Sequence, residues 1–408
     1  MKKSKVFAFA GVTLLAATFL AACSGSKDSK SASKKDTTYG YVYTDDPTTL
    51  DYTVSSKASV HDITTNGVDG LLENDKYGNL VPSIAEDWSV SKDGLTYTYK
   101  IRKGVKWYDA DGEEHGEVTA HDFVTGLKHA ADKKSESLPL VKDSIKGLKD
   151  YSEGKISDFS EVGVKAVDDY TLEYTLNQPE TFWNSKTTNG VLFPISTEFL
   201  KSKGDEFGQP GNVKSILFNG PFLLKSITSK SEITFEKNED YWDKDNVHID
   251  KIKFSYYDGS DQDSLARGFS DGSYTVARLF PASSNFASVE KKYKDNIYNT
   301  QPGAGVAVFG FNIDRQAYNH TSKTSDDQKS STKKAILNKN FRQAITFALN
   351  RENYSAQVNG KEYAKAAIRN MYTAPAFVQV NGKDFGDVVA DKLQTYGDQW
   401  SGVNLADG

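Results

Sequence analysis

The sequence has one cysteine, Cys23, among its 408 residues. Without a second thiol, an internal disulfide and a metal site built from several cysteines are both excluded. The sequence also lacks an excess of positive charge, because 50 lysine and arginine residues stand against 55 aspartate and glutamate residues, for a formal net charge of −5. Proteins that bind nucleic acid carry basic patches and a high isoelectric point, so we expect no nucleic-acid partner.

The motifs of common enzymes are missing as well. The chain has no G-x-S-x-G motif, and Ser288–Lys291 matches S-x-x-K without the S-D-N and K-T-G motifs that accompany it in serine acylases. Gly303–Gly310 resembles a dinucleotide-binding loop only loosely, because its third glycine is misplaced. We therefore expect no enzyme, no catalytic residue and no cofactor.

Metal sites are not indicated either. His115, His121 and His129 lie in one stretch of the chain but do not form an H-E-x-x-H motif. The acidic segment Asp258–Gly272 lacks the spacing of a calcium-binding loop, and we expect Asp261 or Asp263 to cap a short helix there instead. We expect the histidines to lie in solvated loops and at helix ends, with no bound metal.

The N-terminus has the layout of a secretory signal. Basic residues in Met1–Lys5 precede an apolar run from Val6 to Ala22, which is shorter than the roughly 20 residues that span a bilayer. The run ends in Leu20-Ala21-Ala22-Cys23, the pattern at which bacterial lipoproteins are cleaved and acylated on sulfur. We predict a signal peptide in residues 1–22 and a palmitate-type lipid anchor on Cys23. Ordinary secretion and a retained membrane helix are the alternatives.

Residues 24–38 are serine, lysine, aspartate and threonine with almost no apolar side chain, and we predict a flexible tether over residues 23–38. This order of anchor, tether and globular part places the protein at the cell membrane, on its extracellular face.

The rest of the chain alternates between strand and helix patterns. Residues 95–101, 170–176 and 252–256 alternate apolar and polar side chains, as half-buried strands do. Residues 119–131 and 340–353 carry apolar stripes with helical spacing, the first of them after Thr119 and Asp122, a capping-box start. The polar stretch from His320 to Lys334 predicts a surface loop or a local insertion. These patterns indicate a mixed α/β fold. The 22 tyrosines and 22 phenylalanines fit either core packing or an aromatic-lined cleft.

Four blocks of sequence, in order along the chain, resemble the peptide-binding lipoproteins of bacterial ABC importers, which are extracellular solute-binding proteins of family 5, and within them the Ami/Ali group of Gram-positive bacteria. The first block contains A-x-x-W, a D-G strand, I-R-x-G-V, a D-G turn and T-A-x-D-F at a helix start. The blocks are Ile84–Ala130, Asn219–Ser226, Phe235–Phe254 and Phe341–Asn353.

The resemblance implies a periplasmic-binding-protein-like fold of two α/β lobes with an extra inserted domain. The first lobe would comprise residues 39–72 and 191–300, the inserted domain residues 73–190, and a partial second lobe residues 301–408. The resembling proteins are longer, so we expect the chain to be truncated at its C-terminus, to bind peptide weakly or not at all as given, and to be cut by proteases first after about Thr300.

The resemblance also implies the site. The early peptide-contact loop of the family falls on Ser59, Val60 and His61, where a relative has glutamate in place of Val60, so main-chain contacts survive there and a charge contact does not. Asn219 and Gly220 lie in the block that faces the cleft. The hinge falls on Gly303, Ala304 and Gly305, and each of these positions could equally serve a turn or packing.

The function that the resemblance implies is that of a monomeric receptor, anchored to the membrane by lipid, that binds oligopeptides and delivers them to the permease subunits of an ABC transporter. The alternative is a surface peptide binder without a transport role, a sensor or an adhesin, on the same scaffold.

Overall fold

The structure is a computed structural model, and it describes residues 37–281, 283–298, 305–365, 367–374 and 377–395. The chain divides into two units, Met1–Thr37 and Thr38–Gly408, and every helix and strand below belongs to the second unit. None of the helices in the described ranges combines the length and the apolar character needed to cross a bilayer.

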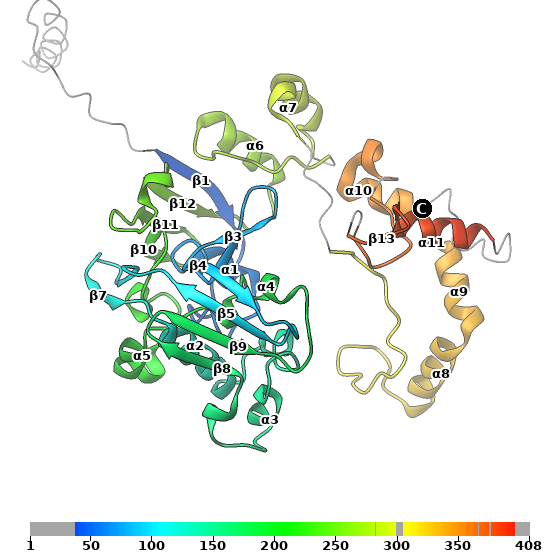
Figure 1. Cartoon of the computed structure of the whole chain (residues 1–408). Coiled ribbons are helices and arrows are strands. Elements are labelled where there is room, and N and C mark those ends of the chain that lie inside the picture. The colour runs from blue at the N-terminus through cyan, green and yellow to red at the C-terminus, as the bar shows by residue number, and fades with distance from the viewer. Residues whose placement is uncertain (1–36, 282, 299–304, 366, 375–376, 396–408) are drawn as a thin grey trace, which may run out of the picture. The chain divides into compact units, whose positions relative to one another are not determined.

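The first four-stranded sheet joins the start of this unit to residues about 210 positions further along the chain. Its order is β1-β12-β11-β10, with β1 parallel to β12 and the other neighbours antiparallel. Leu224, Ile233, Phe235 and Ile252 from these strands lie in one hydrophobic cluster. The strands are β1 (Thr38–Tyr43), β10 (Phe222–Thr228), β11 (Glu232–Lys237) and β12 (Lys251–Tyr256) (Figure 1).

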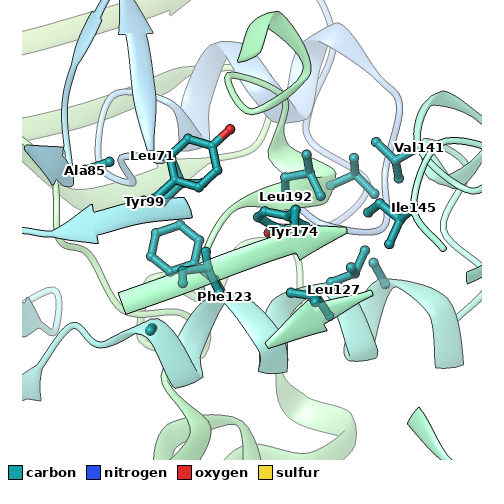
Figure 2. Packing of buried hydrophobic residues seen from close by; sticks show 14 of the residues in the cluster. Leu71, Ala85, Tyr99, Phe123, Leu127, Val141, Ile145, Tyr174 and Leu192 are labelled. Carbon is teal, nitrogen blue, oxygen red and sulfur yellow. The ribbon is translucent and has the colours of Figure 1, made fainter. Parts of the chain in front are cut away.

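The second four-stranded sheet is antiparallel throughout, in the order β4-β5-β9-β8. Its strands are β4 (Ala85–Val90), β5 (Thr96–Ile101), β8 (Val164–Asp168) and β9 (Thr171–Thr175). Helix α2 (Ala120–Asp132) packs against β8 and β9. Figure 2 shows Phe123 and Leu127 of this helix pointing toward Tyr99 of β5 and Tyr174 of β9, all within one buried cluster.

Shorter elements connect and flank these sheets. The hairpins are β2 (Leu72–Asn74) with β3 (Leu80–Pro82), β6 (Lys106–Tyr108) with β7 (Glu114–Glu117), and β13 (Gln379–Val380) with β14 (Lys383–Asp384). The helices are α1 (Ala58–Thr64), α3 (Leu148–Ser152), α4 (Trp183–Lys186), α5 (Thr197–Lys203), α6 (Gln262–Asp271), α7 (Phe286–Tyr293), α8 (Asp326–Leu337), α9 (Lys339–Ala348), α10 (Arg351–Tyr363) and α11 (Phe385–Gln394).

Most of the local predictions are confirmed. The three alternating segments form β5, β9 and β12, and the two apolar stripes form α2 and α9. Thr119 and Asp122 make the predicted capping box at the start of α2. Asp261 caps α6 by accepting a hydrogen bond from the Ser264 N–H.

The predicted loop at 320–334 is wrong from Asp326 onward, because this residue begins helix α8. Ser325 accepts a hydrogen bond from the Gln328 N–H, and the Gln328 side chain accepts from the Ser325 N–H, so the helix has a complete capping box. The prediction failed because we identified helices by an apolar stripe, which this segment lacks. A capped helix with exposed polar side chains does not need one.

Candidate functional site

The predicted peptide-contact residues Ser59, Val60 and His61 lie in helix α1 rather than in the expected loop, and Ser59 and His61 are half-buried. The Val60 side chain is 0% exposed, so it belongs to the core. The Val60 N–H donates to the Lys57 carbonyl at 3.1 Å, and the Val60 carbonyl oxygen accepts from the Thr64 hydroxyl at 3.0 Å. The His61 Nε2 atom lies 2.9 Å from the Ser55 carbonyl oxygen. Because a carbonyl oxygen only accepts, this contact places the hydrogen of the imidazole on Nε2.

The second predicted segment meets the turn that follows α1. The N–H groups of Asn219 and Gly220 both donate to the carbonyl oxygen of Gly67, at 3.1 and 2.9 Å. The N–H groups of Gly67 and Val68 in turn donate to the Thr64 carbonyl at the end of α1, at 3.0 and 2.9 Å. The structure therefore brings the two predicted segments together through one short turn, although about 160 residues separate them in the sequence.

This contact requires glycine on both sides. A Cβ atom on Gly220 would lie 2.8 Å from the Gly67 carbonyl carbon, and one on Gly67 would lie 2.7 Å from the Phe218 ring. Both distances are shorter than side-chain carbons tolerate, so either substitution would push the turn away from the start of β10.

The Asn219 side chain is 1% exposed and acts inside the protein. Its Oδ1 atom accepts a hydrogen bond from the Asp69 N–H at 2.7 Å, and its Nδ2 atom has no partner among the described residues. The arrangement thus gives Asn219 a role in holding the turn. Ligand contact by Asn219 and Gly220 stays a prediction.

A buried carboxyl group, Asp69, lies at the centre of this arrangement, and sequence reasoning missed it. Its Oδ2 atom accepts a hydrogen bond from the Tyr241 hydroxyl at 2.7 Å. Burial raises the pKa of Asp69 to about 7. The Tyr241 hydrogen bond opposes that rise, and the nearby charges of Glu73 and Asp243 add to it. The sequence does contain a signal for this residue, because Asp69 stands in an apolar run with Val68, Gly70, Leu71 and Leu72. Burying an acidic side chain costs free energy, so an aspartate in such a run indicates a special role.

Several other predicted residues lie outside the described part of the chain. Cys23 and the hinge residues Gly303 and Ala304 fall there, and Gly305 is exposed with open space around the position of a Cβ atom. The anchor and the hinge stay predictions.

The three histidines do not gather at one site, and the expectation that they lie in solvated loops and at helix ends is wrong for His129, which is buried within α2. The Nε2 atom of each faces a different carboxylate: His115 faces Asp109 at 3.3 Å, His121 faces Asp169 at 3.4 Å, and His129 faces Asp51 at 2.7 Å. Within the described ranges, no group of three or more histidine, cysteine or acidic side chains is placed to hold a metal ion.

Comparison with known proteins gives the context of this site. A family model described as bacterial extracellular solute-binding proteins, family 5 Middle, matches residues 79–388. The chain is 63% identical over 408 residues to the oligopeptide-binding protein AmiA of Streptococcus pneumoniae, and 59% identical over 410 aligned residues to the oligopeptide-binding protein SarA of Streptococcus gordonii. All of this chain is covered in both matches, but only 62% of each relative.

Solved structures agree. The chain is similar to OppA of Listeria monocytogenes bound to peptide, with a TM-score of 0.68 and 26% identity, over 86% of this chain and 64% of that one. The predicted fold class, a mixed α/β chain with the two-lobed fold of these proteins, is confirmed, and the chain covers part of that fold. The predicted domain boundaries stay a prediction.

Proposed function

Because this chain belongs to family 5 of the bacterial extracellular solute-binding proteins, we propose that it is a receptor that binds oligopeptides outside the cell and delivers them to an ABC transporter. One observation carries the proposal: AmiA and SarA, both named as oligopeptide-binding proteins, align with the whole of this chain at 63% and 59% identity. The relatives are longer, so activity, substrate and transporter partner are all part of the proposal.

The chemistry of the site is compatible with a ligand of variable sequence. The Val60 side chain is buried, and main-chain hydrogen bonds to an extended peptide do not depend on the side chains of that peptide. Bridging water can accommodate different side chains at little cost in affinity. Ser59, Val60 and His61 are the residues that we propose for this contact.

The proposed organisation of the chain follows the two sheets. Pairing of β1 with β12 supports a first lobe made of residues 39–72 and 191–300, and the second sheet, with all its strands between residues 85 and 175, supports an inserted domain at 73–190. Residues 301–408 would contribute to the second lobe. Cys23 would carry the lipid anchor.

Peptide binding is tested with two purified proteins. One is this chain, and the other is this chain joined to the part of AmiA that it does not cover. We expect calorimetry with a mixed-sequence oligopeptide library to give saturable heat with the joined protein, and free amino acids and zinc to give none. The AmiA part alone serves as the control. The peptide proposal fails if neither protein binds the library, or if free amino acids give equal heat.

Transport is tested separately from binding, because a surface sensor or adhesin would also bind peptide. Cells that express the protein should accumulate a labelled peptide, and deletion of the partner permease should abolish the accumulation. Peptide binding at the surface without accumulation would instead favour the non-transport alternative.

A further inference from the structure

We propose that Asp69 is a positioning residue for peptide binding: together with Tyr241 and Asn219 it holds the turn after α1, and loss of its proton loosens that hold on Ser59, Val60 and His61. The proposal rests on the proposed function, because it concerns the same predicted contact residues. Its test contains a ligand-independent arm that separates the two.

Three segments that are distant in sequence converge on Asp69. The first is the turn itself, continuous with α1 through the bonds from Gly67 and Val68 to Thr64. The second is the start of β10, whose Asn219 side chain accepts from the Asp69 N–H. The third is the loop after β11, which supplies the Tyr241 hydroxyl.

The second and third segments are also joined to each other. The Asn238 Nδ2 group donates to the Gly220 carbonyl at 3.0 Å, and the Asn238 N–H donates to the Pro221 carbonyl at 2.8 Å. The Tyr241 N–H then donates to the Asn238 carbonyl at 3.2 Å. The Tyr241 hydroxyl is therefore presented to Asp69 from a loop that is itself fixed to the segment before β10.

The charges around Asp69 favour its neutral form. Glu73, on the strand that follows the turn, and Asp243, beyond the loop that carries Tyr241, are acidic and oppose a second negative charge. Arg102 lies 3.9 Å from the Trp242 ring centre, and its Nε atom donates to the Ser83 carbonyl. Among the described residues no lysine or arginine forms an ion pair with Asp69.

A buried carboxylate without a cation is costly even though it still accepts the hydrogen bond from Tyr241, and the neutral acid avoids that cost. The pKa of about 7 is far above that of an exposed aspartate, about 3.9, so the folded protein retains a proton that the unfolded chain has released. The stability that the neutral carboxyl contributes is fully present below the pKa of the unfolded chain, about 3.9, and is lost progressively as pH rises from there through about 7. The turn is therefore held most firmly below this pH.

The first arm of the test measures affinity for the mixed-sequence oligopeptide library one pH unit below and one unit above the pKa of about 7. With the joined protein described above, we expect the wild-type sequence to bind several-fold more weakly at the higher pH. The Asp69→Asn variant, which keeps the shape and cannot ionise, should bind at both pH values as the wild type does at the lower one. The matched control is Asp62→Asn, an exposed carboxylate on α1 itself, which should keep the wild-type pH dependence.

The second arm needs no ligand. Amide hydrogen exchange of residues 64–70, corrected for the intrinsic effect of pH, should show protection that falls with rising pH in the wild type and not in Asp69→Asn. If no peptide binds but this difference is present, the positioning of the turn stands and the peptide function fails. If peptide binds and neither affinity nor protection differs between the two proteins across this pH range, the positioning proposal is overturned.

A second variant covers the case in which Asp69→Asn does not fold. Tyr241→Phe removes the hydroxyl that stabilises the ionised carboxyl, so the midpoint of the pH dependence should move to higher pH. A merely structural role of Tyr241 would lower affinity or protection equally at all pH values, and that result would contradict the proposal.

Discussion

At the scale of single residues, Asp122 connects three elements. Its Oδ2 atom accepts hydrogen bonds from the Thr119 N–H at 3.0 Å and from the Trp107 Nε1–H at 3.1 Å, and its Oδ1 atom accepts from the Thr197 N–H at 3.2 Å. Burial raises the pKa of Asp122, and these donors oppose that rise. One carboxyl group therefore ties β6, the start of α2 and the start of α5 together.

We predict that Asp122→Ala lowers the free energy of unfolding by about 2–4 kcal/mol, because it leaves several buried donors without an acceptor. Urea denaturation measures this effect. Glu86→Ala, which removes an exposed carboxylate on β4 that makes no described side-chain hydrogen bond, should change stability by less than about 0.5 kcal/mol. Equal effects of the two substitutions would contradict the connecting role of Asp122.

At the scale of elements, helix α8 depends on its capping box. Ser325→Ala removes the side-chain acceptor for the Gln328 N–H, and this should destabilise the helix by about 1 kcal/mol. Hydrogen exchange of residues 326–337 should show a corresponding loss of protection. Ser330→Ala, in the exposed middle of the same helix, should leave protection unchanged or slightly raised, because alanine is the better helix former. A Ser330 variant that loses as much protection would argue against the cap.

At the scale of the whole molecule, burial is unevenly distributed along the chain. Both hydrophobic clusters lie between Leu50 and Ile252. Among the described residues beyond Gly305, Ala364 is the only apolar side chain that is fully buried. Phe309 and Phe377, in the same part of the chain, are each 77% exposed. Regions with few buried apolar contacts open locally at low cost in free energy.

Outside the predicted tether at residues 23–38, limited trypsin digestion should therefore cut first within residues 305–395, and mass spectrometry should find a resistant fragment that contains Leu50–Ile252. Lys334 and Lys361 are exposed candidates for early cleavage. Cleavage at equal rates in residues 50–252 and in residues 305–395 would contradict this prediction.

The proposed lipid anchor is also a property of the whole molecule, because it decides where the receptor works. Cys23→Ala should abolish labelling of the membrane fraction by radioactive palmitate and block removal of the signal peptide, since only a thiol forms the thioether. Ser24→Ala is the matched control and should leave both labelling and signal removal unchanged. Unchanged label on the Cys23 variant would exclude the anchor.

The sequence by itself determined the features that depend on neighbours within a few residues. The alternation around Tyr97 and Tyr99 predicts β5 because successive side chains of a strand face opposite sides. Thr119 and Asp122 predict the start of α2 because a capping box closes within one helical turn. Even α8 had its signal in Ser325 and Gln328, although the lack of an apolar stripe hid it.

Only the tertiary structure decided what depends on distant pairing. The contact of Asp69 with Tyr241 joins residues 172 positions apart, and the contact with Asn219 joins residues 150 positions apart. Neither has a local hydrogen-bonding pattern or periodicity that could reveal its partner. Their meeting follows from the place of β10 at one edge of its sheet, and from the glycines that let the turn after α1 approach it closely. A sequence pattern can indicate that an acidic residue is buried, but its neighbours, and hence its charge at a given pH, are fixed only when the chain has folded.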